Sequence, residues 1–202
     1  MDLLAKAGSV ITKRPKPSPD EYLKHQEKLN LCHLDGRVEL PEEFDAALSY
    51  GEWLEERLGE PSSVLIIGCR TGYEVRAFAG LFDSAQIVGM DLVSTFLGIA
   101  QAQGAKNLLQ ADMHKLPFAD RSFDWCYSMG TLEHAHDPQQ VVDEMCRVAS
   151  TIYLTADLDE DSANPSHYSF STTQQDWVKL FPPAFQTEHF KRDNSVHILA
   201  RS

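Results

Sequence analysis

The stretch Val64-Leu-Ile-Ile-Gly-Cys-Arg-Thr-Gly72 decides how we interpret this chain. It begins with a continuous apolar run, which is typical of a strand buried on both faces in a parallel sheet. Gly68 ends the run, and a glycine there allows a tight turn and lets a ligand approach the backbone closely. Residues 73–81 then have the pattern of a helix. The stretch therefore predicts a strand, a glycine turn and a helix.

A turn of this kind has a known use in doubly wound α/β sheets. The amides at the start of the following helix face a ligand at the turn, and a nucleotide-like cofactor binds at the first such turn of the sheet. The alternative is a strand and a helix joined by a glycine turn with no ligand.

Strands and helices continue to alternate after this turn. We expect strands at residues 86–90, 107–111, 123–129 and 151–156, with helices at 94–103 and 138–149. Such alternation implies a parallel sheet with right-handed crossovers. Residues 171–181 are predicted to form a helix that Pro182 and Pro183 end. The last two apolar runs, 185–190 and 196–200, are joined by too short a link for a parallel crossover, so they should pair antiparallel.

The fold class predicted is therefore α/β, with a doubly wound, mostly parallel seven-stranded sheet and an antiparallel C-terminal strand pair. We expect residues 41–202 to form a single domain, which starts with a helix from Pro41 to about Leu58. Residues 1–40 form an N-terminal arm, extended through the proline-rich residues 13–19 and then helical, which we interpret as a lid candidate.

Two carboxylates follow neighbouring strands of the predicted sheet. Asp91 ends the second strand and Asp112 follows the third, so both should lie at the carboxyl edge beside the glycine turn. An acidic residue about 20 residues after the glycines can accept hydrogen bonds from ribose hydroxyls. The alternative is two solvated aspartates at loop starts.

Composition and charge disfavour several classes of protein. The chain has 202 residues, 43% hydrophobic and 24% charged, which suits one globular domain. Its net charge of −12 argues against nucleic acid or an anionic membrane as partner. The sequence has neither an apolar run of membrane-spanning length nor a signal-peptide core. The four cysteines lie far apart and form no CxxC pair, which argues against a redox dithiol. Together these features predict a cytoplasmic protein.

A longer motif lies between the third and fourth strands and beyond. It reads Asp112-Met-His-Lys-Leu-Pro-Phe-Ala-Asp-Arg-Ser-Phe-Asp124, followed by Leu132-Glu-His134 and Asp137-Pro138. With the glycine turn, it resembles the class I S-adenosylmethionine-dependent methyltransferases, in particular the compact group with a minimal fold. The resemblance runs from about Phe44 to Arg201.

The resemblance implies S-adenosylmethionine as the cofactor and a set of residues that bind it. Asp91 would bind the ribose, Asp112 would accept from the adenine amino group, and Leu92 and Met113 would flank adenine. The complete set implied is Gly68, Cys69, Arg70, Gly72, Asp91, Leu92, Asp112, Met113, Ser128 and Met129.

Two positions of the first motif depart from the family pattern. Ile66 stands where an acidic residue is usual, and Arg70 stands where a glycine is usual. Both changes make the region around the glycine turn more positively charged. The alternative function is therefore a non-catalytic or regulatory protein on a degenerate methyltransferase fold, binding an adenosyl or anionic nucleotide ligand. A nicotinamide-linked enzyme is a third interpretation, although Arg70 and Tyr73 replace the glycines that a GxGxxG motif needs.

Other polar residues are candidates for the acceptor side. His134 and His167 are the candidates for a general base, and with Tyr168 they are the candidates for substrate contacts. His134 and His136 lie two residues apart, but no third ligand can be identified, so we predict no metal site. We expect methyl transfer to a small-molecule acceptor, without nucleic acid or membrane partners. The sequence leaves the oligomeric state open.

Overall fold

The computed structural model describes residues 11–13, 15–34, 41–158, 167–171 and 173–202. Its helices are α1 (Pro19–Leu34), α2 (Pro41–Leu58), α3 (Tyr73–Leu81), α4 (Ser94–Ala102), α5 (Pro138–Val148) and α6 (Gln174–Val178), with a 3-10 helix η1 (Leu132–His134). Its strands are β1 (Thr12–Lys13), β2 (Ser63–Ile67), β3 (Gln86–Asp91), β4 (Leu108–Gln110), β5 (Phe123–Ser128), β6 (Ala149–Asp157), β7 (Ser169–Phe170), β8 (Gln186–Arg192) and β9 (Ser195–Arg201).

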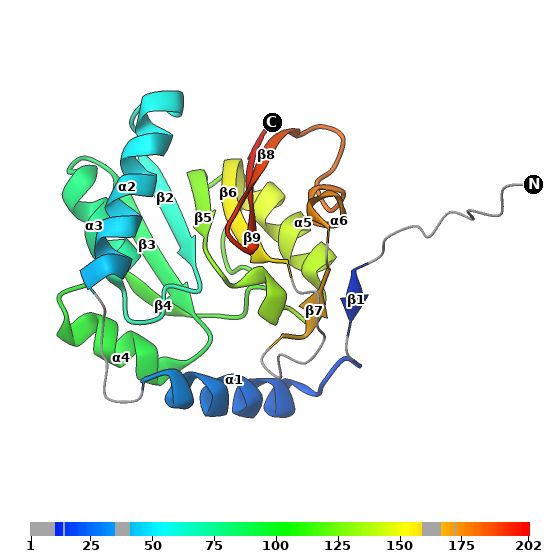
Figure 1. Ribbon diagram of the computed structural model, residues 1–202. Helices are drawn as coiled ribbons and strands as arrows, with labels where there is room; N and C mark the ends of the chain where they lie inside the picture. The colour runs from blue at the N-terminus through cyan, green and yellow to red at the C-terminus, as the bar shows by residue number, and fades with distance from the viewer. Residues whose placement is uncertain (1–10, 14, 35–40, 159–166, 172) are drawn as a thin grey trace, which may run out of the picture.

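A seven-stranded sheet forms the centre of the molecule, in the order β4-β3-β2-β5-β6-β9-β8. Its first five strands are parallel, and β9 pairs antiparallel with both β6 and β8. The chain moves outward from β2 to β4 and then returns to the other side of β2 to form β5 (Figure 1). This confirms the predicted fold class. The reversal beside β2 is a topological switch point, where ligands bind at the carboxyl ends of the strands.

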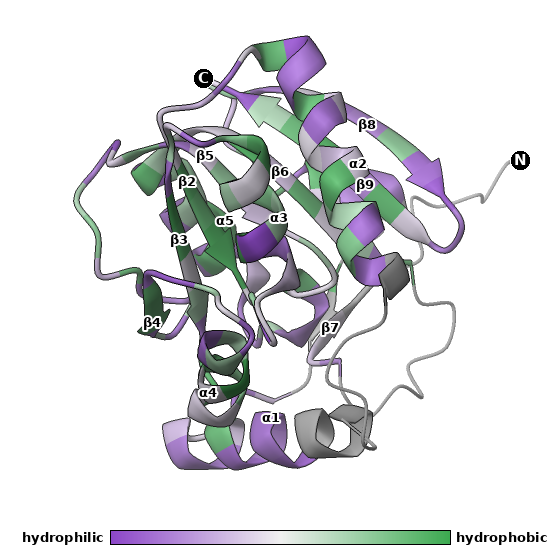
Figure 2. Cartoon of the chain, turned by 90° about the vertical axis from the view of Figure 1, so that its left-hand side faces the viewer, coloured by the Kyte–Doolittle hydropathy of each residue, from purple (hydrophilic) through white to green (hydrophobic). Residues whose placement is uncertain are grey.

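Helices cover both faces of the sheet because its central strands are apolar on both sides. On one face α2 and α3 pack through residues such as Leu54 and Phe78, and on the other α5 and α6 pack through Met145 and Trp177. Figure 2 shows β2 and β3 largely in the hydrophobic colour, whereas the edge strand β8 is mostly hydrophilic. A strand buried on both faces needs such a continuous apolar run, which is why residues 64–67 located β2 correctly.

The N-terminal arm crosses the carboxyl edge of the sheet. In both views α1 lies along that edge (Figures 1 and 2), and Tyr22 of this helix is 4% exposed. The Tyr22 hydroxyl donates a hydrogen bond to the His134 carbonyl at 3.0 Å, and its ring packs edge-on against Tyr168. Before α1, β1 pairs antiparallel with β7, a contact that the sequence did not predict. Of the predicted arm, residues 1–10, 14 and 35–40 lie outside the described residues.

The helices differ most from their predicted lengths at α6, which was predicted over residues 171–181 and spans Gln174–Val178. α6 was expected to reach Phe181, but the α-helix ends at Val178. The amides of Leu180 and Phe181 bond three residues back, to Trp177 and Val178, so the last turn is tighter than an α-helix. Within the described part of the chain, none of the helices combines the length and apolarity that crossing a membrane requires.

Candidate active site

A cavity of about 330 Å³ lies at the switch point. Its walls include the carboxyl ends of β2 and β3, the segments after β4 and β5, and Tyr22 and Gln26 of α1. Two aspartates, Asp91 and Asp112, line it from neighbouring strands. The structure thus brings the predicted glycine turn and both predicted carboxylates to one cavity.

The glycine turn at the end of β2 is tight and leaves no room for a side chain at its first position. Gly68 has a φ of +74°, and a Cβ atom there would lie 2.3 Å from the Thr131 hydroxyl oxygen. The amides of Gly68 and Cys69 both donate to the Met90 carbonyl, at 2.9 and 3.0 Å. These bonds join the turn to β3, so the backbone at Gly68 and the side chain of Asp91 are held in fixed relation.

Asp91 is a buried acidic group of the cavity wall, at 8% exposure. Its Oδ2 accepts from the Arg70 amide at 3.0 Å, and its Oδ1 accepts from the Val93 amide at 2.9 Å. Burial raises the pKa of this carboxyl, and the hydrogen bonds from the two amides oppose that change. A carboxylate offers about four acceptor positions, so each oxygen can accept a further hydrogen bond from a ligand.

Asp112 is oriented by His114. Its Oδ1 accepts from the His114 amide at 2.9 Å and lies 2.7 Å from the ring Nδ1. Because His114 Nε2 accepts from the Asp137 amide at 3.3 Å, the ring proton belongs on Nδ1, facing Asp112. Burial opposes ionisation of Asp112, but the hydrogen bonds from His114 outweigh it and lower the pKa of Asp112. The His114 ring in turn stacks on His136, with centroids 3.7 Å apart.

The two departures from the family motif have different structural settings. Ile66 is fully buried in the core on the α2–α3 side and is not part of the cavity wall. Arg70 does line the cavity, and its Nη1 lies 3.9 Å from Glu43 Oε1. Its φ of +42° is a left-handed conformation that glycine adopts at less cost, which explains why the position suits glycine. The positive charge of Arg70 therefore lies close to the carboxylate of Glu43.

The sequence-predicted site residues separate into two groups. Those that line the cavity are Gly68, Arg70, Asp91, Leu92, Asp112, Met113, His134 and His167. Those outside its lining are Cys69, Gly72, Ser128, Met129 and Tyr168.

The residues outside the lining have structural contacts of their own. A Cβ atom on Gly72 would meet Ala100 of α4 at 2.7 Å, so this glycine permits close helix packing. Ser128 Oγ donates to the Ile67 carbonyl at 3.1 Å, and Met129 Sδ accepts from the Tyr127 hydroxyl. Their roles as cofactor contacts stay predictions.

Several cavity residues had no clear signal in the sequence. Tyr22 and Gln26 come from an arm whose position could not be inferred, and Thr131 and Glu133 belong to the segment after β5. Spacing along α1 could have paired Tyr22 with Gln26, since residues four apart share a helix face. Nothing in the sequence indicated which part of the domain that face meets.

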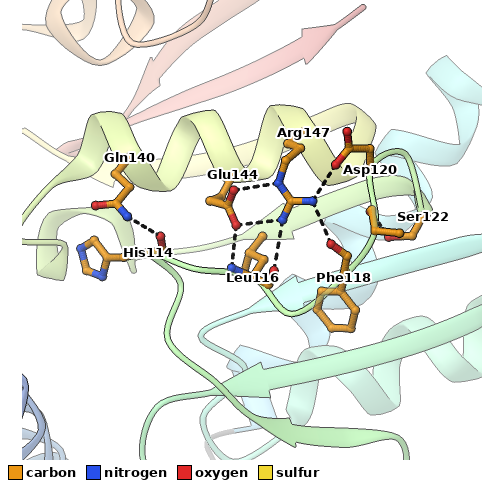
Figure 3. A network of polar contacts seen from close by, with 9 residues as sticks. His114, Leu116, Phe118, Asp120, Ser122, Gln140, Glu144 and Arg147 are labelled. Atoms are coloured by element: carbon orange, nitrogen blue, oxygen red, sulfur yellow. Dashed lines mark hydrogen bonds and ion pairs between the residues drawn. The ribbon is translucent and has the colours of Figure 1, made fainter.

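A polar network holds the loop that follows Asp112 (Figure 3). The guanidinium of Arg147 on α5 donates to both carboxylate oxygens of Glu144, at 2.7 and 2.8 Å. It also donates to the carbonyls of Leu116 and Phe118, at 3.1 and 2.8 Å. Glu144 accepts from the Leu116 amide at 2.7 Å, which closes the network. Arg147 therefore fixes the backbone that carries Asp112 and Met113 to the cavity.

Replacing Arg147 by methionine is expected to lower the free energy of unfolding by about 2–4 kcal/mol, because two loop carbonyls and Glu144 lose a charged donor. Lysine at this position should lose less, since it keeps the charge but lacks the planar fork. Urea unfolding measures the change, with Lys106→Met at an exposed position as the control. Equal stability of Arg147→Met and the control would contradict the structural role.

Residues 65–151 match the family model described as a methyltransferase domain. Ajmaline N-methyltransferase from Rauvolfia serpentina is 26% identical over 174 residues, covering 81% of this chain and 59% of that protein. The chain thus spans less than two thirds of that relative.

Solved structures share the fold at low identity. The plantazolicin methyltransferase BpumL, in complex with SAH, superposes with a TM-score of 0.68 at 13% identity, covering 91% of this chain and 95% of that one. The [4+2]-cyclase SpnF superposes with a TM-score of 0.66 at 20% identity, covering 90% of this chain and 77% of that one.

The sheet order, the glycine turn and the cavity at the switch point define a Rossmann-like α/β protein of the methyltransferase type. With the family model that matches residues 65–151, they support a class I S-adenosylmethionine-dependent methyltransferase.

Proposed function

We propose that this protein transfers a methyl group from S-adenosylmethionine to a small-molecule acceptor. The observation that carries the proposal is the joint placement of Asp91 and Asp112 in one cavity beside Gly68. A nucleoside presents two ribose hydroxyls and one amino group as donors, and two carboxylates on neighbouring strands match that pattern. The match of residues 65–151 to the methyltransferase family model supports the same reaction.

The residues of the cavity fit this cofactor. Asp91 keeps acceptor capacity on both oxygens for the ribose, and His114 holds Asp112 toward the adenine position. Leu92 and Met113 give an apolar lining beside them. When bound, S-adenosylmethionine supplies an electrophilic methyl group on a sulfonium. The protein then contributes mainly by holding the acceptor in line with that group, which is worth several kcal/mol of activation free energy.

An acceptor that must lose a proton would need a base, and two histidines line the cavity. The rings of His134 and His167 meet edge to face, with centroids 5.2 Å apart. His134 is held through its backbone by Tyr22, and His167 precedes Tyr168, whose amide donates to the Glu133 carbonyl. We propose these two histidines as the acceptor-facing base candidates.

Arg70 favours a second candidate function, the binding of an anionic adenosyl or nucleotide ligand without methyl transfer. It places a cation in the cavity wall, where a sulfonium ligand carrying a net charge of about +1 is repelled. SpnF shares this fold and is named as a cyclase, so the fold is also used for activities other than methyl transfer.

Calorimetry on the full chain separates the two functions. S-adenosylmethionine, S-adenosylhomocysteine, NAD and ATP are titrated in parallel, and methyl transfer is then assayed with pools of small molecules, protein and RNA. We expect binding of both adenosyl ligands and methylation within the small-molecule pool only. Tighter binding of ATP than of either adenosyl ligand, without methyl transfer to any pool, would support the second function and refute the first.

Replacing Arg70 by glycine is expected to tighten binding of S-adenosylmethionine by about threefold to tenfold at low salt, because one screened charge near the sulfonium is removed. S-adenosylhomocysteine, which lacks the sulfonium charge and has no net charge, is the matched control ligand, and its affinity should change less. The difference between the two ligands should shrink at high salt. An equal effect on both ligands would show that Arg70 acts through the shape of the turn and not through charge.

We also propose that α1 acts as a lid over the cavity. Tyr22 and Gln26 line the cavity from this helix, and Tyr22 joins it to the His134 backbone. Replacing Tyr22 by alanine is expected to speed dissociation of S-adenosylhomocysteine by about tenfold, because the lost burial and hydrogen bond are together worth over 1 kcal/mol. Stopped-flow displacement measures the rate, with Tyr22→Phe as an intermediate variant. An unchanged rate in Tyr22→Ala would rule out the lid.

A further inference from the structure

Three potential metal ligands converge in the wall of the cavity. Glu133 and His134 lie on η1, and His167 arrives from the segment before β7. One ligand atom from each lies within 4.8 Å of the other two. Glu133 and His167 are buried, at 2% and 4% exposure, and all three line the cavity that contains Asp91.

The fold supplies the third ligand that the sequence did not reveal. His136, the sequence neighbour of His134, stacks on His114 instead of joining this cluster. His167 takes its place, although it is separated from η1 by α5 and β6 along the chain.

We propose that Glu133, His134 and His167 bind one divalent transition-metal ion. Two imidazoles and a carboxylate are a ligand set used for catalytic Zn²⁺ and for non-haem Fe²⁺. The His134 and His167 ring centroids are 5.2 Å apart. Two imidazoles that bind one tetrahedral ion at about 2.0–2.1 Å place their centroids roughly 5 Å apart, so the rings already have the required separation.

Hydrogen bonds of the main chain hold the two segments that carry the ligands. The Tyr168 amide donates to the Glu133 carbonyl at 2.9 Å, and Ser169 Oγ donates to the Ala135 carbonyl at 2.7 Å. The Tyr22 hydroxyl donates to the His134 carbonyl at 3.0 Å. Glu133 and His134 accept two of these bonds through their own carbonyls, and His167 directly precedes Tyr168. The backbone that carries the three ligands is therefore already held, which reduces the conformational entropy that metal binding would cost.

The charge balance also suits a divalent ion. Two neutral imidazoles and the Glu133 carboxylate carry a charge of −1, and Asp157 lines the same cavity. A divalent ion would balance the negative charge of this buried ligand set. Three protein ligands leave positions open for an exogenous oxygen. If the proposed methyl transfer holds, an acceptor would bind at those positions through a hydroxyl or two adjacent oxygens, and the metal would lower the pKa of the oxygen to be methylated. With metal bound, His134 and His167 would act as ligands and not as general bases.

Metal binding is tested directly on tag-free, full-length protein that has been stripped with a chelator. Zn²⁺, Co²⁺ and Mg²⁺ are titrated by calorimetry, and retained metal is counted by mass spectrometry after gel filtration. We expect one equivalent of Zn²⁺ or Co²⁺ and weak binding of Mg²⁺, which prefers oxygen ligands. Glu133→Gln and His167→Gln should each weaken Zn²⁺ binding by more than about tenfold, since changes even to groups that only support ligands cost that much. His189→Gln, at an exposed position on β8, is the matched control and should leave it unchanged.

The variants also separate this inference from the proposed function. Binding of S-adenosylhomocysteine is measured on each variant without metal, and circular dichroism confirms folding. If His167→Gln does not fold, His134→Gln, at the less buried ligand, takes its place. Equal Zn²⁺ affinity in wild type and both ligand variants, or no binding to wild type, overturns the metal site. Metal binding without any adenosyl ligand binding would instead overturn only the proposed methyl transfer.

Discussion

Replacing Asp91 by asparagine is expected to weaken binding of S-adenosylhomocysteine by at least about tenfold, because hydrogen bonds to a charged group contribute about 1.5–3 kcal/mol each. Asparagine keeps the size of the side chain but has one acceptor oxygen where the carboxylate has two. The Arg70 and Val93 amides already use both oxygens of Asp91. In the variant, an amide NH₂ group would face one of these N–H donors, so the glycine turn and the ribose contact are disturbed together.

Calorimetry measures this loss, and Asp83→Asn is the control because Asp83 is exposed after α3. Asp91→Ala should bind no better than Asp91→Asn and should also be less stable, since it leaves both amides without their partner at a cost of about 1–3 kcal/mol each. An Asp91→Asn protein that is folded and binds as tightly as wild type would remove the cofactor from this edge of the sheet.

Replacing Glu74 by glutamine is expected to raise the free energy of unfolding by about 3 kcal/mol at pH 7. Glu74 lies in the first turn of α3 at 2% exposure, and burial raises the pKa of its carboxyl from 4.5 to about 8. Between these values the folded protein holds a proton that the unfolded chain has lost. Each pH unit in this window therefore lowers stability by about 1.4 kcal/mol.

The comparison between wild type and Glu74→Gln should depend on pH in a defined direction. The two proteins should be almost equally stable near pH 4.5, and the advantage of the variant should grow until about pH 8, where it levels off. Chemical unfolding at a series of pH values measures this. Glu56→Gln, at an exposed position of α2, is the control and should show no growing advantage. A constant difference across the whole range would mean that Glu74 stays ionised in the folded protein.

The fold was predictable where the signal is local. The helices predicted at residues 41–58 and 73–81 both have the expected bounds. The short link after β8 forces an antiparallel pair, and β8 and β9 pair in that way. Asp91 and Asp112 could be placed at one edge because parallel strands align their carboxyl ends.

The rest of the site depends on contacts between distant segments. The pairing of β1 with β7 and the docking of Tyr22 involve residues too polar or too few to show a periodic pattern. His167 meets Glu133 and His134 only because the chain returns after β6. The family pattern also did not indicate that Ser128 and Met129 bond within the protein, since such detail depends on which face of the sheet each side chain takes.

The arm that crosses the cavity affects the order in which the protein forms during synthesis. A ribosome delivers α1 early, but the groups that Tyr22 contacts belong to residues 134 and 168, and the partner of β1 is residues 169–170. Chains grow at about 5–20 residues per second, so the arm has no docking partner until most of the domain has been made. The sheet core can therefore assemble first, with the cavity still open. A small ligand can therefore enter the cavity of the newly made protein before the arm covers it.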